Sequence, residues 1–101
     1  MKNSYVIEYL NENEFRKKER AVKKYNMLAY KKLIFEFYPN FRDGIFDGVV
    51  VSKNAGEGIV KYELKLPTDS TFAKVYDDIV LHYTVYEQQK IVMLNNITPD
   101  D

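Results

Sequence analysis

The chain of 101 residues has no cysteine and only one histidine. The lack of cysteine excludes a disulfide framework, a thiolate zinc site and a cysteine nucleophile. A single histidine without cysteine also gives no cluster with metal-ligand spacing, so we expect neither a metal nor a cofactor. Gly56 and Gly58 lie in a turn between two expected strands. A glycine-rich phosphate-binding loop instead lies between a strand and a helix, so these glycines do not indicate one.

Long apolar runs are also missing. No apolar stretch follows Met1, so we expect no signal peptide. No run reaches the 18 residues that would make a membrane-spanning helix. From these absences we expect a cytoplasmic protein that does not use a membrane.

Aromatic residues are abundant, with nine tyrosines and six phenylalanines. A chain of this length is one domain's worth and buries roughly two-thirds of the surface that its unfolded form exposes. We therefore expect residues 1–101 to form a single domain with its own hydrophobic core.

The hydrophobic period changes along the chain and predicts the order of elements. Apolar residues alternate in the first strand, then recur at threes and fours behind Asn11, a helix N-cap with Glu14 three residues later. The helix should stop at Pro39. A break near Asn26, a modest helix former, is the alternative to one continuous helix. The expected strands are Ser4–Leu10, Phe46–Ser52, Ile59–Leu66, Asp78–Tyr86 and Ile91–Ile97.

This order predicts an α+β fold, in which an antiparallel sheet has one long helix or a helical hairpin packed on one face. In the strand Ile59–Leu66, the alternation turns Val60, Tyr62, Leu64 and Leu66 toward the core. The same alternation turns the charged residues of that strand, among them Lys61 and Lys65, toward the other face.

Charge is segregated along a chain whose net charge is zero. Residues 1–40 carry nine Lys and Arg against five acids, whereas residues 41–101 carry six against ten. Residues 16–32 alone hold eight bases and one acid, Glu19. Such a basic helix can be an ordinary solvated face, or it can bind phosphates or an acidic protein.

The expected binding surface combines these helix bases with polar residues of the sheet. His82 can be a general base or a partner-contact residue, or simply a polar residue on the wet face of a strand. Most of the tyrosines are expected in the core. The candidate residues are Arg16, Lys17, Arg20, Lys23, Lys24, Lys61, Lys65, His82 and Tyr86.

The order of a strand, a basic helical hairpin and an antiparallel meander resembles the RelE/ParE toxin superfamily of bacterial toxin–antitoxin modules. The local similarity lies in Tyr62–Leu66, Ile79–Tyr86 and Lys90–Leu94, with Ser4–Tyr9 at the start. The resemblance implies an antitoxin partner, and it implies that Lys61 and Lys65 correspond to the strand lysines of the RNA-cleaving members.

Two positions depart from the RNA-cleaving pattern. The apolar run Ile79–Leu81 replaces the expected arginine, and Thr98–Asp101 replaces the basic or aromatic C-terminal residues. An RNA-cleaving site needs cations near the phosphate and a proton donor. We therefore expect a toxin-like or degenerate toxin-like protein that acts mainly by binding a protein. Whether it also catalyses a reaction stays open, although the residues expected for RNA cleavage are largely absent.

Two other classes of function fit the same pattern. One is a small phage or mobile-element protein that binds and inhibits a host factor without catalysis. The other is a binding domain like the cystatins or the nuclear transport factors, for which one unbroken helix is expected. The oligomeric state stays open, and nucleic acid remains a possible partner of the basic helix.

Overall fold

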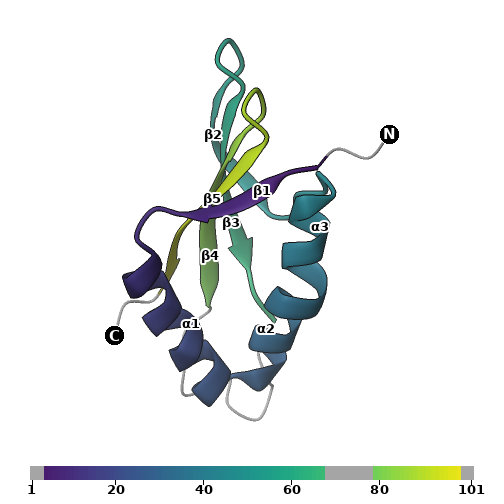
Figure 1. Cartoon of the computed structure of the whole chain (residues 1–101). Coiled ribbons are helices and arrows are strands. Elements are labelled where there is room, and N and C mark those ends of the chain that lie inside the picture. Colours follow the sequence, from purple (N-terminus) through teal and green to yellow (C-terminus); the bar gives the residue numbers. More distant parts are fainter. Residues whose placement is uncertain (1–3, 68–78, 99–101) are drawn as a thin grey trace.

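One five-stranded sheet forms the centre of the molecule, and the helices lie together on one side of it (Figure 1). The computed structural model describes residues 4–67 and 79–98. Its elements are β1 (Val6–Tyr9), α1 (Glu12–Tyr25), α2 (Met27–Lys32), the π-helical segment η1 (Leu33–Phe37), α3 (Tyr38–Arg42), β2 (Val49–Asn54), β3 (Ile59–Lys65), β4 (Val80–Tyr86) and β5 (Ile91–Thr98). The predicted α+β class is confirmed.

The sheet has the order β1-β5-β4-β3-β2, and its strands are not all antiparallel. Strands β2 to β5 pair antiparallel, but β1 pairs parallel with β5, with Val6 opposite Ile91. The expectation of a purely antiparallel sheet is therefore wrong at this edge. Two helical passes, α1 and then α2 to α3, separate β1 from β2. The chain direction then reverses between each of the successive strands from β2 to β5, so that β5 runs in the same direction as β1.

Asn11 starts α1 as predicted, because its side-chain Oδ1 accepts a hydrogen bond from the Glu14 amide at 3.2 Å. Asn26 ends the same helix, and the predicted break is also confirmed. The Asn26 amide donates to the Val22 carbonyl at 2.7 Å, while its side chain accepts from the Ala29 amide at 3.2 Å. One buried asparagine thus closes α1 and opens α2, which produces a helical hairpin.

Pro39 does not end the helical region, so that expectation is wrong. Proline disrupts a helix interior because it lacks an amide proton and clashes with the carbonyl four residues before it. Here Pro39 lies in the first turn of α3, directly after the wider π turn in which the Tyr38 amide donates to the Leu33 carbonyl. The chain leaves the helix only at Gly44, whose φ is +81°.

Strand β2 starts three residues later than predicted. Phe46 belongs to the aromatic core instead, with its ring 5.1 Å from Tyr5 and 6.1 Å from Phe41 between centroids. Gly48 then takes a φ of +112°, and pairing with β3 begins at the next residue, Val49. The other strand limits agree with the prediction to within two residues, except that Asp78 lies outside the described residues.

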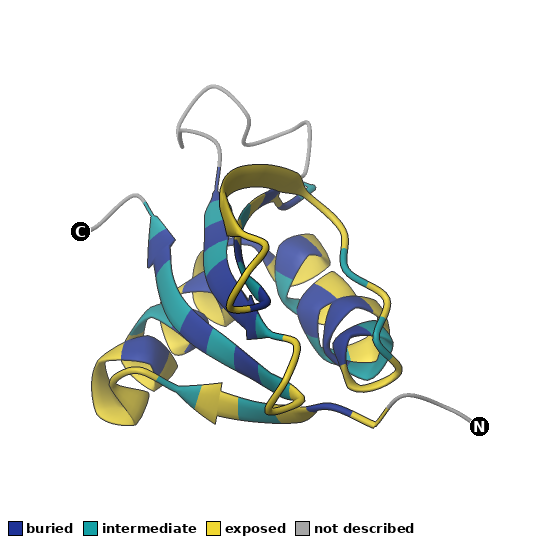
Figure 2. Ribbon diagram, turned by 90° about the horizontal axis from the view of Figure 1, so that it is seen from above, coloured by how far each residue is buried: buried dark blue, intermediate teal, exposed yellow. Residues whose placement is uncertain are grey.

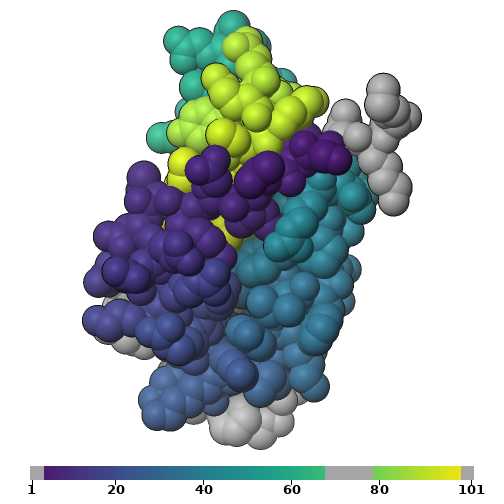
Figure 3. Space-filling model, viewed as in Figure 1, coloured from purple at the N-terminus to yellow at the C-terminus, as the bar shows by residue number. Residues whose placement is uncertain are grey.

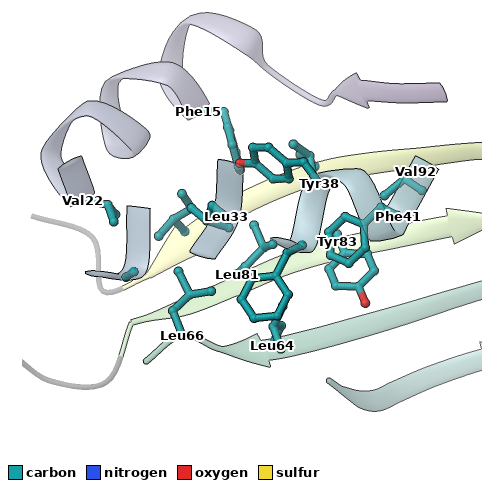
Figure 4. Close-up of a cluster of buried hydrophobic side chains, with 14 of the residues drawn as sticks. Phe15, Val22, Leu33, Tyr38, Phe41, Leu64, Leu66, Leu81, Tyr83 and Val92 are labelled. Carbon is teal, nitrogen blue, oxygen red and sulfur yellow. The ribbon is translucent and has the colours of Figure 1, made fainter. Parts of the chain in front are cut away.

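The core fills the space between the helices and the sheet (Figure 4). The predicted inward positions of β3 are confirmed, since Val60, Leu64 and Leu66 are buried and Tyr62 is partly buried. Tyr62 stacks on the fully buried Tyr83 at 4.9 Å between ring centroids. Aromatic pairs of this kind add to the stabilisation that burial alone provides.

Glu19 is the one acid of the basic segment, and it is buried between α1 and α3. The Tyr38 hydroxyl donates to Glu19 Oε2 at 2.7 Å, and Arg16 Nη1 lies 3.9 Å from Glu19 Oε1. Burial, helped by the Glu19 carboxylate, raises the pKa of the Tyr38 hydroxyl, which therefore stays protonated and remains a donor. This contact fixes the two arms of the helical layer to each other.

We expect Tyr38→Phe to lower the free energy of unfolding by about 1–3 kcal/mol, because it leaves a buried carboxylate without its donor. Urea unfolding followed by circular dichroism measures the change. Glu36→Gln is the control, since the Lys32–Glu36 pair is half exposed and should be worth about 0.5 kcal/mol or less. Equal effects of the two changes would contradict the role given to the buried contact.

Candidate protein-binding surfaces

The first surface lies on the outside of the helical layer. We call it the basic helical surface and define it by seven exposed cations: Arg16, Lys17, Arg20, Lys23, Lys24, Lys31 and Lys32. The first five were predicted as site residues, and α1 brings all five together. In Figure 3, α1 and α2 occupy the lower part of the face that the view presents.

Few of these cations have an anionic partner. Arg16 contacts Glu12 at 3.0 Å, and Lys32 contacts Glu36 at 2.7 Å. Among the described residues, no carboxylate lies within ion-pair distance of Lys17, Arg20 or Lys31. Glu19 is buried against Tyr38 and lies within ion-pair distance of only one of these cations, Arg16, at 3.9 Å.

Aromatic rings hold two further cations of this surface. Lys23 Nζ lies 5.4 Å from the centre of the Tyr30 ring, and Lys24 Nζ lies 5.2 Å from that of Tyr25. Such cation–π contacts orient an ammonium group but leave its charge uncompensated. The field of the surface therefore stays positive.

Apolar side chains are exposed next to these cations. Tyr25, Met27 and Leu28 are each about half exposed, and Phe35 on η1 is 75% exposed. Leu28, Lys31 and Phe35 follow a helical spacing, so apolar and basic groups alternate on one side of α2 and η1. Exposed aromatic and methionine residues are typical of the centre of protein–protein interfaces.

The second surface is the face of the sheet opposite the helices. Along β3 and β4 the predicted residues Lys61, Lys65, His82 and Tyr86 alternate with core residues, and so they point away from the helical layer. The structure gathers these four residues on one face, but it does not join them to the basic helical surface. The residues that the sequence suggested as one combined site thus lie on two separate surfaces.

His82 is held at both ring nitrogens. Its Nε2 lies 2.8 Å from Thr98 Oγ1 on β5, and its Nδ1 lies 3.5 Å from Glu63 Oε2 on β3. The ring thus links three neighbouring strands through side-chain contacts. Glu63 and Thr98 were not singled out in the sequence, because only the strand register brings them to His82.

Neither a metal-ligand cluster nor a membrane-spanning helix is found in the described part of the chain. No group of three or more His, Cys, Asp or Glu side chains there could hold a metal ion. None of the described helices is long and apolar enough to span a membrane. Comparison with known proteins finds no matching family model, no matching curated protein and no matching solved structure.

Proposed function

We propose that the protein binds another protein through the basic helical surface, as a RelE/ParE-like toxin or a degenerate relative of one in a bacterial toxin–antitoxin module. One observation carries the proposal: among the described residues, only Arg16 and Lys32 of the seven exposed cations have a carboxylate within ion-pair distance. An unpaired field of this kind steers an acidic partner and sets its orientation.

The composition of the surface favours a protein over nucleic acid as the partner. Phosphate binding needs cations and hydrogen-bond donors, but it gains little from exposed Met27, Leu28 and Phe35. A protein interface gains from burying such side chains. The partner that fits best is an acidic segment with an apolar stripe, which an antitoxin would supply.

Other features support a binding role of this class. The break at Asn26 makes a helical hairpin. The toxin-like arrangement needs such a hairpin, whereas a cystatin-like domain would have one long unbroken helix. On the sheet face, the contacts of His82 with Thr98 on β5 and Glu63 on β3 favour a role in holding neighbouring strands together.

The first experiment is an affinity pull-down of the tagged protein at low expression in its own host, read by mass spectrometry. Recovery of a small acidic protein encoded next to the toxin-like chain, together with growth arrest when the chain is expressed alone, supports the proposal. Recovery of one unrelated host protein without growth arrest would instead indicate an inhibitor of a host factor.

Charge reversal then tests the surface itself. We expect K23E/K24E to weaken binding of the recovered partner about tenfold or more, as measured by calorimetry, and to reduce the salt dependence of the affinity. K61E/K65E is the matched control, because it makes the same change in net charge on the opposite face of the sheet. If only the control weakens binding, the sheet face is the binding site and the proposal is wrong.

A further inference from the structure

Strand β2 forms one edge of the sheet, and among the described strands only β3 pairs with it. All six of its residues are exposed, as the yellow strand in Figure 2 shows. Val49, Val50 and Val51 are 68%, 48% and 51% exposed. An edge strand leaves backbone amides and carbonyls unpaired, and a run of β-branched residues favours the extended conformation that another strand can join. The pairing of β2 with β3 shifts register between Val50 and Ser52, so the edge is regular only on either side of this irregularity.

The start of this edge is fixed to the core. The Tyr83 hydroxyl donates to the Asp47 carbonyl, and the Tyr83 ring packs 4.4 Å from that of Phe41. Gly48 lies so close to β3 that an added Cβ would be 2.7 Å from the Glu63 carbonyl oxygen. A strand held in this way loses little further conformational freedom when it pairs.

The charges next to β2 favour a second copy of the same strand as the partner of this edge, in the antiparallel orientation. Asp47 precedes the valines and Lys53 follows them, and both are exposed. Neither has an ion-pair partner among the described residues. A second β2 laid antiparallel brings the acidic end of each strand to the basic end of the other, with valines between them. A parallel copy would place like charges together, which destabilises strand pairs.

We propose that two copies of the chain pair antiparallel along β2 about a two-fold axis, which joins their sheets into one ten-stranded sheet. The arrangement is closed, because each copy uses the same edge for its partner. It goes beyond the proposed function, since β2 is no part of the basic helical surface. A six-residue strand pair is smaller than the interface of about 1,200 Å² or more that stable complexes bury, so the dimer forms at micromolar concentrations and above.

Sedimentation equilibrium over a concentration series tests the pairing. We expect the wild type to show a monomer–dimer equilibrium. D47K and K53D should each raise its dissociation constant about fivefold or more, because each puts like charges at both ends of the pair. The double variant D47K/K53D should restore dimerisation, since unlike charges then meet again. Circular dichroism and thermal melting confirm that each variant is folded.

Two outcomes would overturn the proposal. One is a wild type that stays monomeric up to the highest soluble concentration, which would leave β2 free for a strand of a different protein. The other is a dimer that the single and double variants affect alike, which would place the contact elsewhere. K23E/K24E should leave the dimer unchanged, so failure here and failure of the proposed function can be told apart.

Discussion

Replacing Phe41 by alanine should lower the free energy of unfolding by about 3–5 kcal/mol. Phe41 on α3 has no exposed surface, and its ring lies within 6.5 Å of Tyr38, Phe46 and Tyr83 between centroids. Removing it leaves a cavity at the point where the helical layer meets the centre of the sheet (Figure 4). A domain of this size is stable by only about 5–15 kcal/mol, so the variant should be close to unfolding.

The chain supplies a control of the same residue type. Phe35 lies six residues earlier on η1 and is 75% exposed, so Phe35→Ala should change stability by about 0.5 kcal/mol or less. Guanidinium or urea titrations of both variants measure the difference directly. Similar losses for the two phenylalanines would mean that α3 does not pack on the sheet as described.

Gly48→Ala should be the most damaging change at a glycine, with an expected loss of about 3 kcal/mol. Two costs add up at this position. The φ of +112° is one that residues with a Cβ rarely adopt, and the new methyl group would lie 2.7 Å from the Glu63 carbonyl oxygen. Backbone atoms cannot move aside as a flexible side chain can, so β2 would have to separate from β3 at its first pair.

Gly56→Ala provides the matched control in the turn between the same two strands. Its φ is not positive, and the nearest atom that a Cβ would meet is Asn54 Oδ1 at 3.7 Å. We expect the free energy of unfolding to rise or fall by no more than about 1 kcal/mol. Loss of the near-ultraviolet tyrosine signal for Gly48→Ala alone would show that the damage reaches Tyr62 and Tyr83.

Local signals in the sequence were enough to predict the helical hairpin. The Asn11 cap and the Asn26 break depend on side chains that bond to backbone groups three residues away. The alternation along β3 predicted the core positions for a similar reason, since strand geometry fixes which side chains share a face. Interactions of this kind join residues that are close together in the sequence, so the sequence alone can predict them.

The errors arose where distant residues decide the conformation. Pro39 is kept in the helical region because Phe37, Tyr38 and Phe41 around it are buried against the sheet. Phe46 resembles a strand residue in sequence, but the rings of Tyr5 and Phe41 draw it into the core. Tertiary packing overrides local preference at both places.

The candidate site also has features that the sequence predicts and features that depend on distant contacts. The sequence revealed the excess of cations in α1, and it also revealed that Lys61 and Lys65 point outward. It could not reveal that the two groups lie on opposite sides of the sheet, because that depends on which face the helices cover. The burial of Glu19 depends on a contact with Tyr38, nineteen residues away, which no local pattern indicates.

The parallel pairing of β1 with β5 also bears on how the chain folds during synthesis. Among the described strands, β1 is the first to be synthesised, yet its neighbour in the sheet, β5, is the last of them, with Val6 opposite Ile91. Contacts of such high sequence separation slow folding, because the loop must close before they are gained. The nascent helices and the β2–β4 meander can form early, whereas the edge that β1 completes has to wait for β5.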